Sequence, residues 1–180
     1  MTYTQAVLIS GAIFLVFTPI LLLYLRHEYR QNGKLGWLGS IVHFLLYAPH
    51  AMFSCVLAWD TEGIAPLGPL AWIGVPLMIL GLGITVYAMD LFRVFSRWVG
   101  SQTPGLRTGG LYRFSRNPQF VAYGILMLGS IIAWWNSLVW IAFPAYAILV
   151  YAVLHVEEEH LSRVYGEAYQ EYCARVRRFI

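Results

Sequence analysis

The sequence predicts an all-α integral membrane protein, a single domain of five transmembrane helices followed by a cytosolic C-terminal helix. Three observations lead to this prediction. Hydrophobic residues make up 59% of the 180 residues and charged residues only 12%, whereas a soluble domain is about half apolar and about a quarter charged. The apolar residues form long runs of the length that crosses a bilayer. The basic residues gather in only some of the loops between these runs, as the positive-inside rule requires.

Five apolar runs define the predicted spans, at residues 4–25, 37–59, 69–92, 119–134 and 138–155. No cleavage pattern follows the first run, so we expect a retained span and not a signal peptide. The last two spans come from one apolar stretch, which would measure roughly 57 Å as a single helix, about twice the hydrocarbon thickness. Trp134-Trp135-Asn136-Ser137 near its middle favours a turn, which predicts two antiparallel spans.

The charge distribution predicts the orientation. All twelve Lys and Arg residues follow the first, third or fifth run, whereas Asp60 and Glu62 lie in a loop on the opposite side. The positive-inside rule then places the N-terminus outside and the C-terminus in the cytoplasm. This rule explains the net charge of +3, so we expect no nucleic-acid partner. Cys55 lies in an apolar span and Cys173 in the polar tail, so we expect no disulfide.

The stretch 105–123 is rich in glycine, arginine and hydrogen-bonding side chains, in a chain that is otherwise apolar. Arg107, Arg113 and Arg116 offer planar forks that bind carboxylates or phosphates. Pro118 suits the first turn of a helix, and it pushes Asn117 out of helical geometry. The stretch therefore predicts a polar loop that leads into the fourth span at a fixed point. A basic loop that serves orientation alone is the alternative.

A second polar cluster is the carboxylate run Glu157, Glu158 and Glu159 at the end of the fifth span. Acids near a helix C-terminus oppose the helix dipole, and the orientation rule does not favour them here. This mismatch suggests that they face a cation, although a solvated acidic turn is the alternative. Apolar and tyrosine residues after the run recur at spacings of three and four, which predicts a helix that continues from the fifth span.

These segments carry a resemblance to a known superfamily. Residues 109–120 read Gly-Gly-Leu-Tyr-Arg-Phe-Ser-Arg-Asn-Pro-Gln-Phe. They resemble the Gly-Pro-Tyr-Arg-x-x-Arg-(His or Asn)-Pro-x-Tyr signature of the isoprenylcysteine carboxyl methyltransferase and phospholipid methyltransferase superfamily. Glu157-Glu158 and the residues after them are similar to its C-terminal Glu-Glu block, and Gly81-x-Gly83 resembles the glycine motif of its phospholipid branch. The resemblance covers roughly residues 69–178.

The resemblance implies a membrane methyltransferase that uses S-adenosylmethionine, with no metal. The cofactor would bind in a cytosol-facing pocket built from residues 81–83, 105–123 and 155–178. Arg116 would orient the acceptor and Glu157 would offset the cofactor's positive charge; these two are the expected catalytic residues. The expected cofactor-binding residues are Gly81, Gly83, Leu106, Arg107, Tyr112, Asn117, Pro118, Glu157 and Glu158.

The expected acceptor is a lipophilic or small molecule from the bilayer: a lipid, or a prenylated or thiol compound. By resemblance, O-methylation of an isoprenylcysteine-like carboxylate is favoured, with phospholipid N-methylation and thiol S-methylation as alternatives. Asn117, Phe120 and Leu111 stand where many relatives have His, Tyr and Pro. No Arg precedes the glutamates between residues 151 and 156, where relatives often have one.

His43 and His50 are seven residues apart in the second span and are expected to share one helix face. Ionisable groups inside a membrane are candidates for function. They would make a polar interhelical contact, line a channel for the acceptor, or ligate haem or a metal. The last possibility defines an alternative of another class, a haem or redox-associated membrane protein. A reductase related to the sterol reductases is a third possibility, although those chains are longer and have more spans.

Overall fold

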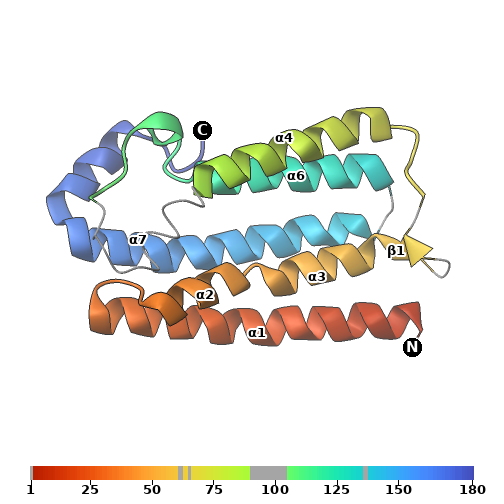
Figure 1. Cartoon of the computed structure of the whole chain (residues 1–180), viewed down its shortest axis with the longest axis horizontal. Helices are drawn as coiled ribbons and strands as arrows, with labels where there is room; N and C mark the ends of the chain where they lie inside the picture. The colour runs from red at the N-terminus through yellow and green to blue at the C-terminus, as the bar shows by residue number, and fades with distance from the viewer. Residues whose placement is uncertain (1, 61–62, 65, 90–104, 136–137) are drawn as a thin grey trace.

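The computed structural model describes residues 2–60, 63–64, 66–89, 105–135 and 138–180. These residues form an elongated helical bundle (Figure 1). The elements, in chain order, are α1 (Tyr3–Asn32), α2 (Trp37–Leu45), α3 (Ala48–Leu57), β1 (Trp59–Asp60), β2 (Gly63–Ile64), α4 (Ala71–Met89), the 3₁₀ turn η1 (Gly110–Arg113), α6 (Pro118–Trp134), the 3₁₀ turn η2 (Val139–Ile141) and α7 (Ala142–Arg175).

The long helices lie side by side along the bundle and reverse direction from one to the next. α4 packs along α6, while α1 packs against α3, α2 and α7 (Figure 1). α7 lies between these two groups, because it contacts α1 and α3 on one side and α6 on the other. The two short strands pair as an antiparallel hairpin at the end of the bundle that holds the N-terminus.

The all-α bundle predicted from the sequence is confirmed. Among the described residues, the segments long and apolar enough to cross a membrane are Tyr3–Asn32, Trp37–Leu57, Ala71–Ala88 and Val139–Arg175, and Pro118–Trp134 is a shorter apolar helix of 17 residues. A 17-residue helix is about 25 Å long, at the lower limit for a span. α6 ends where the predicted turn between the last two spans begins, since Trp135 adopts a φ of 45°; the second half of that turn lies outside the described residues.

The second predicted span, 37–59, differs from its prediction because it is not one continuous helix. α2 ends at Leu45, and α3 begins at Ala48 with Pro49 in its first turn. A proline at this position has no N–H to donate to the preceding turn, so the helical ladder is interrupted there. The two halves follow each other along the bundle (Figure 1), and together they still have the length of a span.

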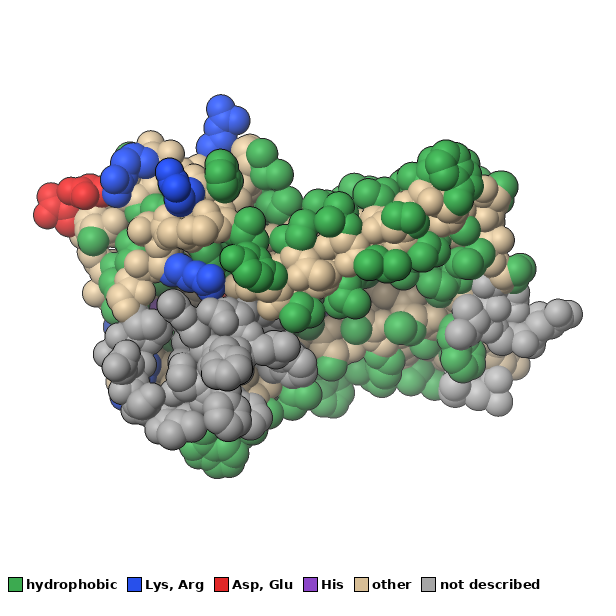
Figure 2. All heavy atoms as spheres, turned by 45° about the horizontal axis from the view of Figure 1, so that its top comes forward, with side chains coloured by type: hydrophobic (Ala, Val, Ile, Leu, Met, Phe, Trp, Pro, Cys, Tyr) green, Lys and Arg blue, Asp and Glu red, His purple; other side chains and the backbone are tan. Residues whose placement is uncertain are grey.

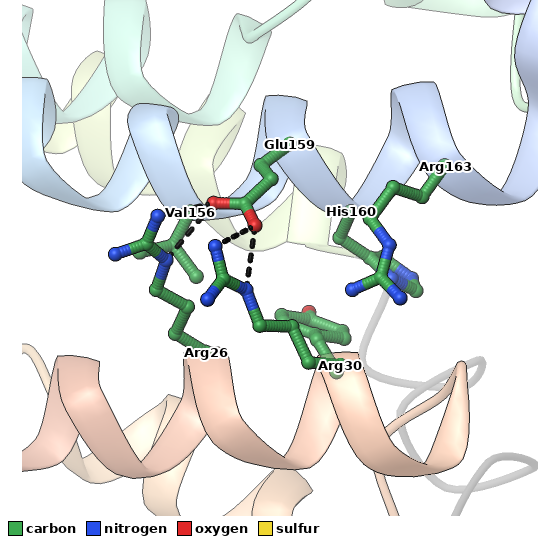
Figure 3. Close-up of a pocket in the computed structure, with 7 residues that line it drawn as sticks. Arg26, Arg30, Val156, Glu159, His160 and Arg163 are labelled. Carbon is green, nitrogen blue, oxygen red and sulfur yellow. Dashed lines mark hydrogen bonds and ion pairs between the residues drawn. The ribbon is translucent and has the colours of Figure 1, made fainter.

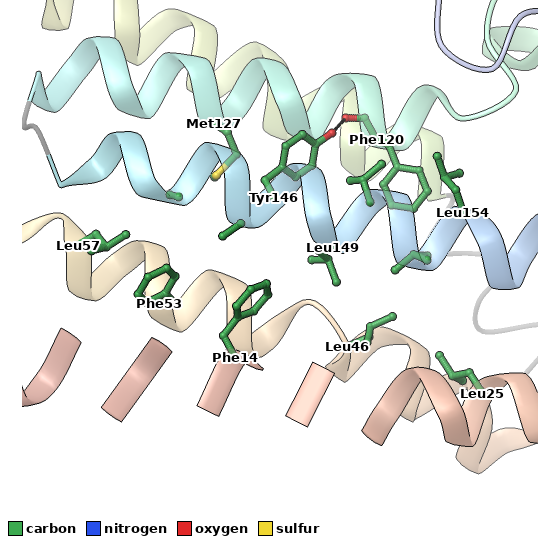
Figure 4. Packing of buried hydrophobic residues seen from close by; sticks show 14 residues of the cluster. Phe14, Leu25, Leu46, Phe53, Leu57, Phe120, Met127, Tyr146, Leu149 and Leu154 are labelled. Atoms are coloured by element: carbon green, nitrogen blue, oxygen red, sulfur yellow. Dashed lines mark hydrogen bonds between the residues drawn. The ribbon is translucent and has the colours of Figure 1, made fainter. Parts of the chain in front are cut away.

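A core of aromatic and aliphatic side chains fills the space between α1, α3, α6 and α7 (Figure 4). Phe14 from α1 stacks against Phe53 from α3, with ring centroids 6.1 Å apart. His50, which is fully buried, lies in the same region, with Nδ1 2.8 Å from the Tyr123 hydroxyl and Nε2 3.1 Å from the Ala142 carbonyl oxygen. Burial of these rings holds the two groups of helices together.

α7 extends far beyond the predicted fifth span, which confirms the predicted C-terminal helix. The helix has 34 residues, and it bends at Gly166, which has a φ of 50° and a ψ of −121°. Glycine adopts this backbone conformation without the steric cost that a Cβ would add. After the bend the chain turns back toward the loop that precedes α6 (Figure 1), and this places the tail beside the predicted polar loop.

Candidate functional site

The described basic residues gather at one end of the bundle, where α1 and α4 end, α6 begins and α7 leaves the span. Figure 2 shows the blue Lys and Arg side chains at the left end of the visible face, with hydrophobic side chains over the helices to the right. Arg93 and Arg97, which we also expect on this side, lie outside the described residues, as do Glu62 and the pair Asn136 and Ser137.

The polar loop and the C-terminal tail are joined by hydrogen bonds. The backbone N–H of Arg116 donates to the carbonyl oxygen of Arg177 (2.9 Å), and the side-chain amide of Asn117 donates to that of Arg178 (3.1 Å). The Tyr172 hydroxyl donates to the carbonyl oxygen of Tyr112 (2.7 Å). Burial raises the pKa of Tyr172 to about 12.

Arg116 and Glu158 face each other where the loop meets α7. Nη1 of Arg116 lies 3.7 Å from Oε1 of Glu158, and both side chains are largely buried, with exposed fractions of 16% and 19%. Nη1 also donates to the sulfur of Cys173. Nε of Arg116 is buried, and within the described part of the chain it has no acceptor. The guanidinium therefore retains one buried donor for an additional partner.

Arg178 from the tail shields the second oxygen of the same carboxylate. Its Nη2 lies 2.6 Å from Oε2 of Glu158, and its Nε donates to Oε1 (3.0 Å). Burial and, after it, the charge of Glu158 raise the pKa of Tyr169, which lies beside the pair. Glu158 thus sits between a loop arginine and a tail arginine, in a polar cluster that neither segment forms alone.

The three consecutive glutamates of α7 point to three different elements. Oε1 of Glu157 lies 3.3 Å from Nε2 of His43 in α2, while Glu158 faces the loop and the tail. Glu159 pairs with Arg26 (2.8 Å) and Arg30 (2.6 Å) of α1. Successive helix residues are about 100° apart around the axis, so Glu157 and Glu158, which the resemblance treats as a pair, have different neighbours here.

Arg107 and Tyr112 lie together over the end of α4. The guanidinium carbon of Arg107 is 4.7 Å from the centroid of the Tyr112 ring, a cation–π geometry. The Tyr112 hydroxyl is 3.4 Å from both the Ala88 carbonyl oxygen and the side-chain oxygen of Gln119. Leu106 is half-buried next to them in sequence. These contacts attach the loop to α4 and α6.

The two glycines of α4, Gly81 and Gly83, have different surroundings. A Cβ on Gly81 would lie 2.5 Å from the Leu126 backbone nitrogen and 2.7 Å from the Ala122 carbonyl oxygen, whereas a Cβ on Gly83 would meet nothing within 4 Å among the described residues. Gly81 therefore lets α4 and α6 approach closely. Pro118 is buried in the first turn of α6, where it starts the helix after Asn117 as predicted.

The sequence did not single out Cys173 or Arg178 as site residues. Their partners are a loop arginine and a glutamate far away in the chain, and no local pattern signals such contacts. The tyrosines of the tail carry a signal, because Tyr169 and Tyr172 follow the helical spacing of three and four that the sequence shows. Both are buried, and Tyr172 holds the loop.

The fold and the site together define an integral membrane protein with a polar site of arginines and carboxylates at one end of a helical bundle. A family model described as phospholipid methyltransferase matches residues 70–168, more than half of the 180 residues. The chain therefore belongs to the phospholipid methyltransferase family, a family of membrane methyltransferases, and the predicted superfamily is confirmed. Neither a curated protein nor a solved structure matches the chain.

The matched segment runs from the start of α4 to just beyond the bend in α7. It includes Arg116 and the three glutamates but not their partners in α1, in α2 and in the tail beyond Ala168.

The haem alternative fits the histidines poorly. Both ring nitrogens of His50 already have partners in the bundle, and His43 faces Glu157, so iron would have to break these contacts.

Proposed function

We propose that this chain transfers a methyl group from S-adenosylmethionine to a lipid acceptor that enters from the bilayer. The observation that supports the proposal best is the contact of Arg116 with Glu158, which joins the polar loop to α7 at 3.7 Å. Two segments that are separate in the sequence, and that both resemble the superfamily, thereby contribute to one cluster. We also propose that this end of the bundle is cytoplasmic, because it collects the basic residues.

The residues present fit the donor in chemical type. S-adenosylmethionine carries a sulfonium, an ammonium and a carboxylate group. Glu157 and Glu158 would place negative charge near the cationic groups, although Arg116 and Arg178 already contact Glu158. The buried Nε of Arg116, without an acceptor among the described residues, would supply a donor for a carboxylate. Leu106 and Arg107 would hold the nucleoside beside Tyr112, and Gly83 and Asn117 complete the expected set.

S-adenosylmethionine would supply an electrophilic methyl group, so the protein's main task is to bring the acceptor into line with it. Proximity and orientation then account for much of the rate. The hydrogen bonds between loop and tail hold the two segments together. An acceptor that binds as an ammonium group must first lose a proton. We assign Oε1 of Glu157, which lies 3.3 Å from Nε2 of His43, as the atom that takes this proton.

The family description favours a phospholipid amine as the acceptor over the isoprenylcysteine-like carboxylate that the sequence motif suggests. Nη1 of Arg116 is already engaged by Glu158 and by Cys173, so a substrate carboxylate would have to bind at the Nε side of the guanidinium group. Thiol acceptors stay the second alternative.

Calorimetric titration of the purified protein with S-adenosylhomocysteine tests the donor assignment. We expect binding that Glu158→Gln weakens at least tenfold, because the neutral amide no longer attracts a cation and leaves Arg116 and Arg178 unbalanced. Glu167→Gln, on the exposed side of the same helix beyond the bend, is the matched control and should bind as the wild type does. Absence of binding by the wild-type protein would refute the proposal.

A second experiment identifies the acceptor. The protein is incubated with donor labelled in its methyl group and with phosphatidylethanolamine, a prenylcysteine or a long-chain thiol, and the products are analysed by mass spectrometry. We expect label on the amine. Label on the prenylcysteine carboxylate instead would overturn the amine assignment and leave the methyltransferase assignment intact.

A further inference from the structure

A shallow basic pocket, open to the surface, lies between α1 and α7, on a different face of α7 from the Arg116–Glu158 contact. It is lined by Arg26, Tyr29, Arg30, Val156, Glu159, His160 and Arg163 (Figure 3). The lining follows helical spacing on both sides: residues 26, 29 and 30 share one face of α1, and residues 156, 159, 160 and 163 share one face of α7. Two facing helix surfaces thus form the pocket.

The pocket holds more positive than negative charge. Arg26 and Arg30 both bind the single carboxylate of Glu159, each through Nε and Nη2 to one oxygen, at 2.6–2.9 Å. This leaves Nη1 of both arginines without an acceptor within the described part of the chain. Arg163 extends from α7 toward α1 in Figure 3, and it also has no acceptor among the described residues. The lining therefore holds three guanidinium groups and a single carboxylate, which pairs with only two of them.

The position of the pocket along the bundle identifies the class of anion. Arg26 directly follows the apolar run of α1, and the pocket floor includes Val156, the last apolar residue before the glutamates. The guanidinium groups therefore lie where an apolar span meets water, which is the depth of lipid headgroups. Basic pockets between transmembrane helices at this level bind phosphate-bearing headgroups, and the planar guanidinium fork matches a phosphate.

We propose that the pocket between α1 and α7 binds the phosphate of an anionic membrane lipid. The phosphate takes the free Nη1 donors of Arg26 and Arg30 together with Arg163, while Glu159 keeps the first two arginines in place. The stacked rings of Tyr29 and His160, with centroids 3.9 Å apart, close one side. This site is distinct from the Arg116–Glu158 contact, because Glu159 lies on a different face of α7 from Glu158.

Arg163→Gln is the sharpest variant, because it removes a guanidinium group and leaves the ion pairs of Glu159 with α1 intact. Arg175→Gln is the matched control, since Arg175 lies on the same helix but outside the pocket. Binding is measured by native mass spectrometry of the detergent-solubilised full chain with phosphatidylglycerol, with diacylglycerol of the same acyl chains, and with inorganic phosphate.

We expect phosphatidylglycerol to bind and diacylglycerol not to bind. Arg163→Gln should weaken phosphatidylglycerol binding about fivefold, the effect of one basic residue near an anionic lipid surface, and Arg175→Gln should leave it unchanged. Equal binding of the two lipids, or equal loss in both variants, would overturn the proposal. Inorganic phosphate that binds as tightly as the lipid would overturn the assignment of the anion to a lipid.

Discussion

Replacing Gly81 with alanine, compared with the same change at Gly83, tests how α4 and α6 are held together. The two glycines lie two residues apart on one helix, in the motif that resembles a cofactor-binding element. Only Gly81 has backbone atoms of α6 against the position of a Cβ, at 2.5 Å and 2.7 Å. Real Cβ atoms do not approach backbone atoms so closely, so Gly81→Ala must push the helices apart.

The expected size of the effect follows from two opposing contributions. Alanine in place of glycine inside a helix stabilises by roughly 0.5–1 kcal/mol, because the unfolded chain loses freedom. Overpacking a close interface costs about 1–3 kcal/mol, and backbone atoms cannot rotate aside as a side chain can. Both variants share the first contribution, so we expect Gly81→Ala to be less stable than Gly83→Ala by about 1–3 kcal/mol.

Equilibrium unfolding in mixed detergent micelles, followed by circular dichroism, measures this difference. Equal stability of the two variants would refute the close approach of α4 and α6 at Gly81. The same pair separates packing from ligand binding in the glycine motif. Loss of S-adenosylhomocysteine binding in Gly83→Ala, with its stability unchanged, would support the predicted cofactor role of Gly83.

Three further predictions concern other parts of the fold. Hydrogen bonds from Arg30 and then Arg26 lower the pKa of the Glu159 carboxyl. The stabilisation from this contact is therefore present above the unfolded-state pKa and is lost as the pH falls through the folded-state pKa. In thermal unfolding scans at decreasing pH, Glu159→Gln should lack this part of the acid-induced loss of stability. Gly166→Ala should loosen the tail, because a Cβ at a φ of 50° costs about 1–3 kcal/mol; limited proteolysis should then remove the tail faster than in the wild type. His50→Leu removes the ring nitrogens that contact the Tyr123 hydroxyl and the Ala142 carbonyl oxygen in the core, and it should destabilise the bundle by about 1–3 kcal/mol, measured by the same micelle unfolding.

The spans could be predicted from the sequence because the bilayer imposes one strong condition. Every backbone polar group in lipid must bond within its own helix, so an apolar run of sufficient length already defines a span. The break between α2 and α3 escaped prediction, because Pro49 within an apolar run is compatible with both a kinked helix and two helices. The bend at Gly166 escaped for a similar reason, since glycine permits a bend without requiring one.

The sequence predicts which segments form the candidate site, but it does not predict which side chains contact each other there. The loop 105–123 and the glutamate run stand out because they are polar in an apolar chain, and the structure brings Arg116 and Glu158 together. Which carboxylate meets which cation depends on how the helices are arranged around α7. No local pattern contains that information, so the contacts of Glu159 with α1 and of Glu158 with the tail appear only in the structure.

The glutamate run links the first helices to the candidate site, although the family match begins at residue 70. Adjacent helix residues face directions about 100° apart, so no single cation can be shared equally by three successive carboxylates. Glu157 turns to His43 in α2 and Glu159 to two arginines of α1. These contacts fix the rotation of α7 about its axis, and that rotation directs Glu158 at the loop. Removal of α1 to α3 would therefore take away the partners of Glu157 and Glu159. It would also remove the contacts that set the rotation of α7 and so orient Glu158.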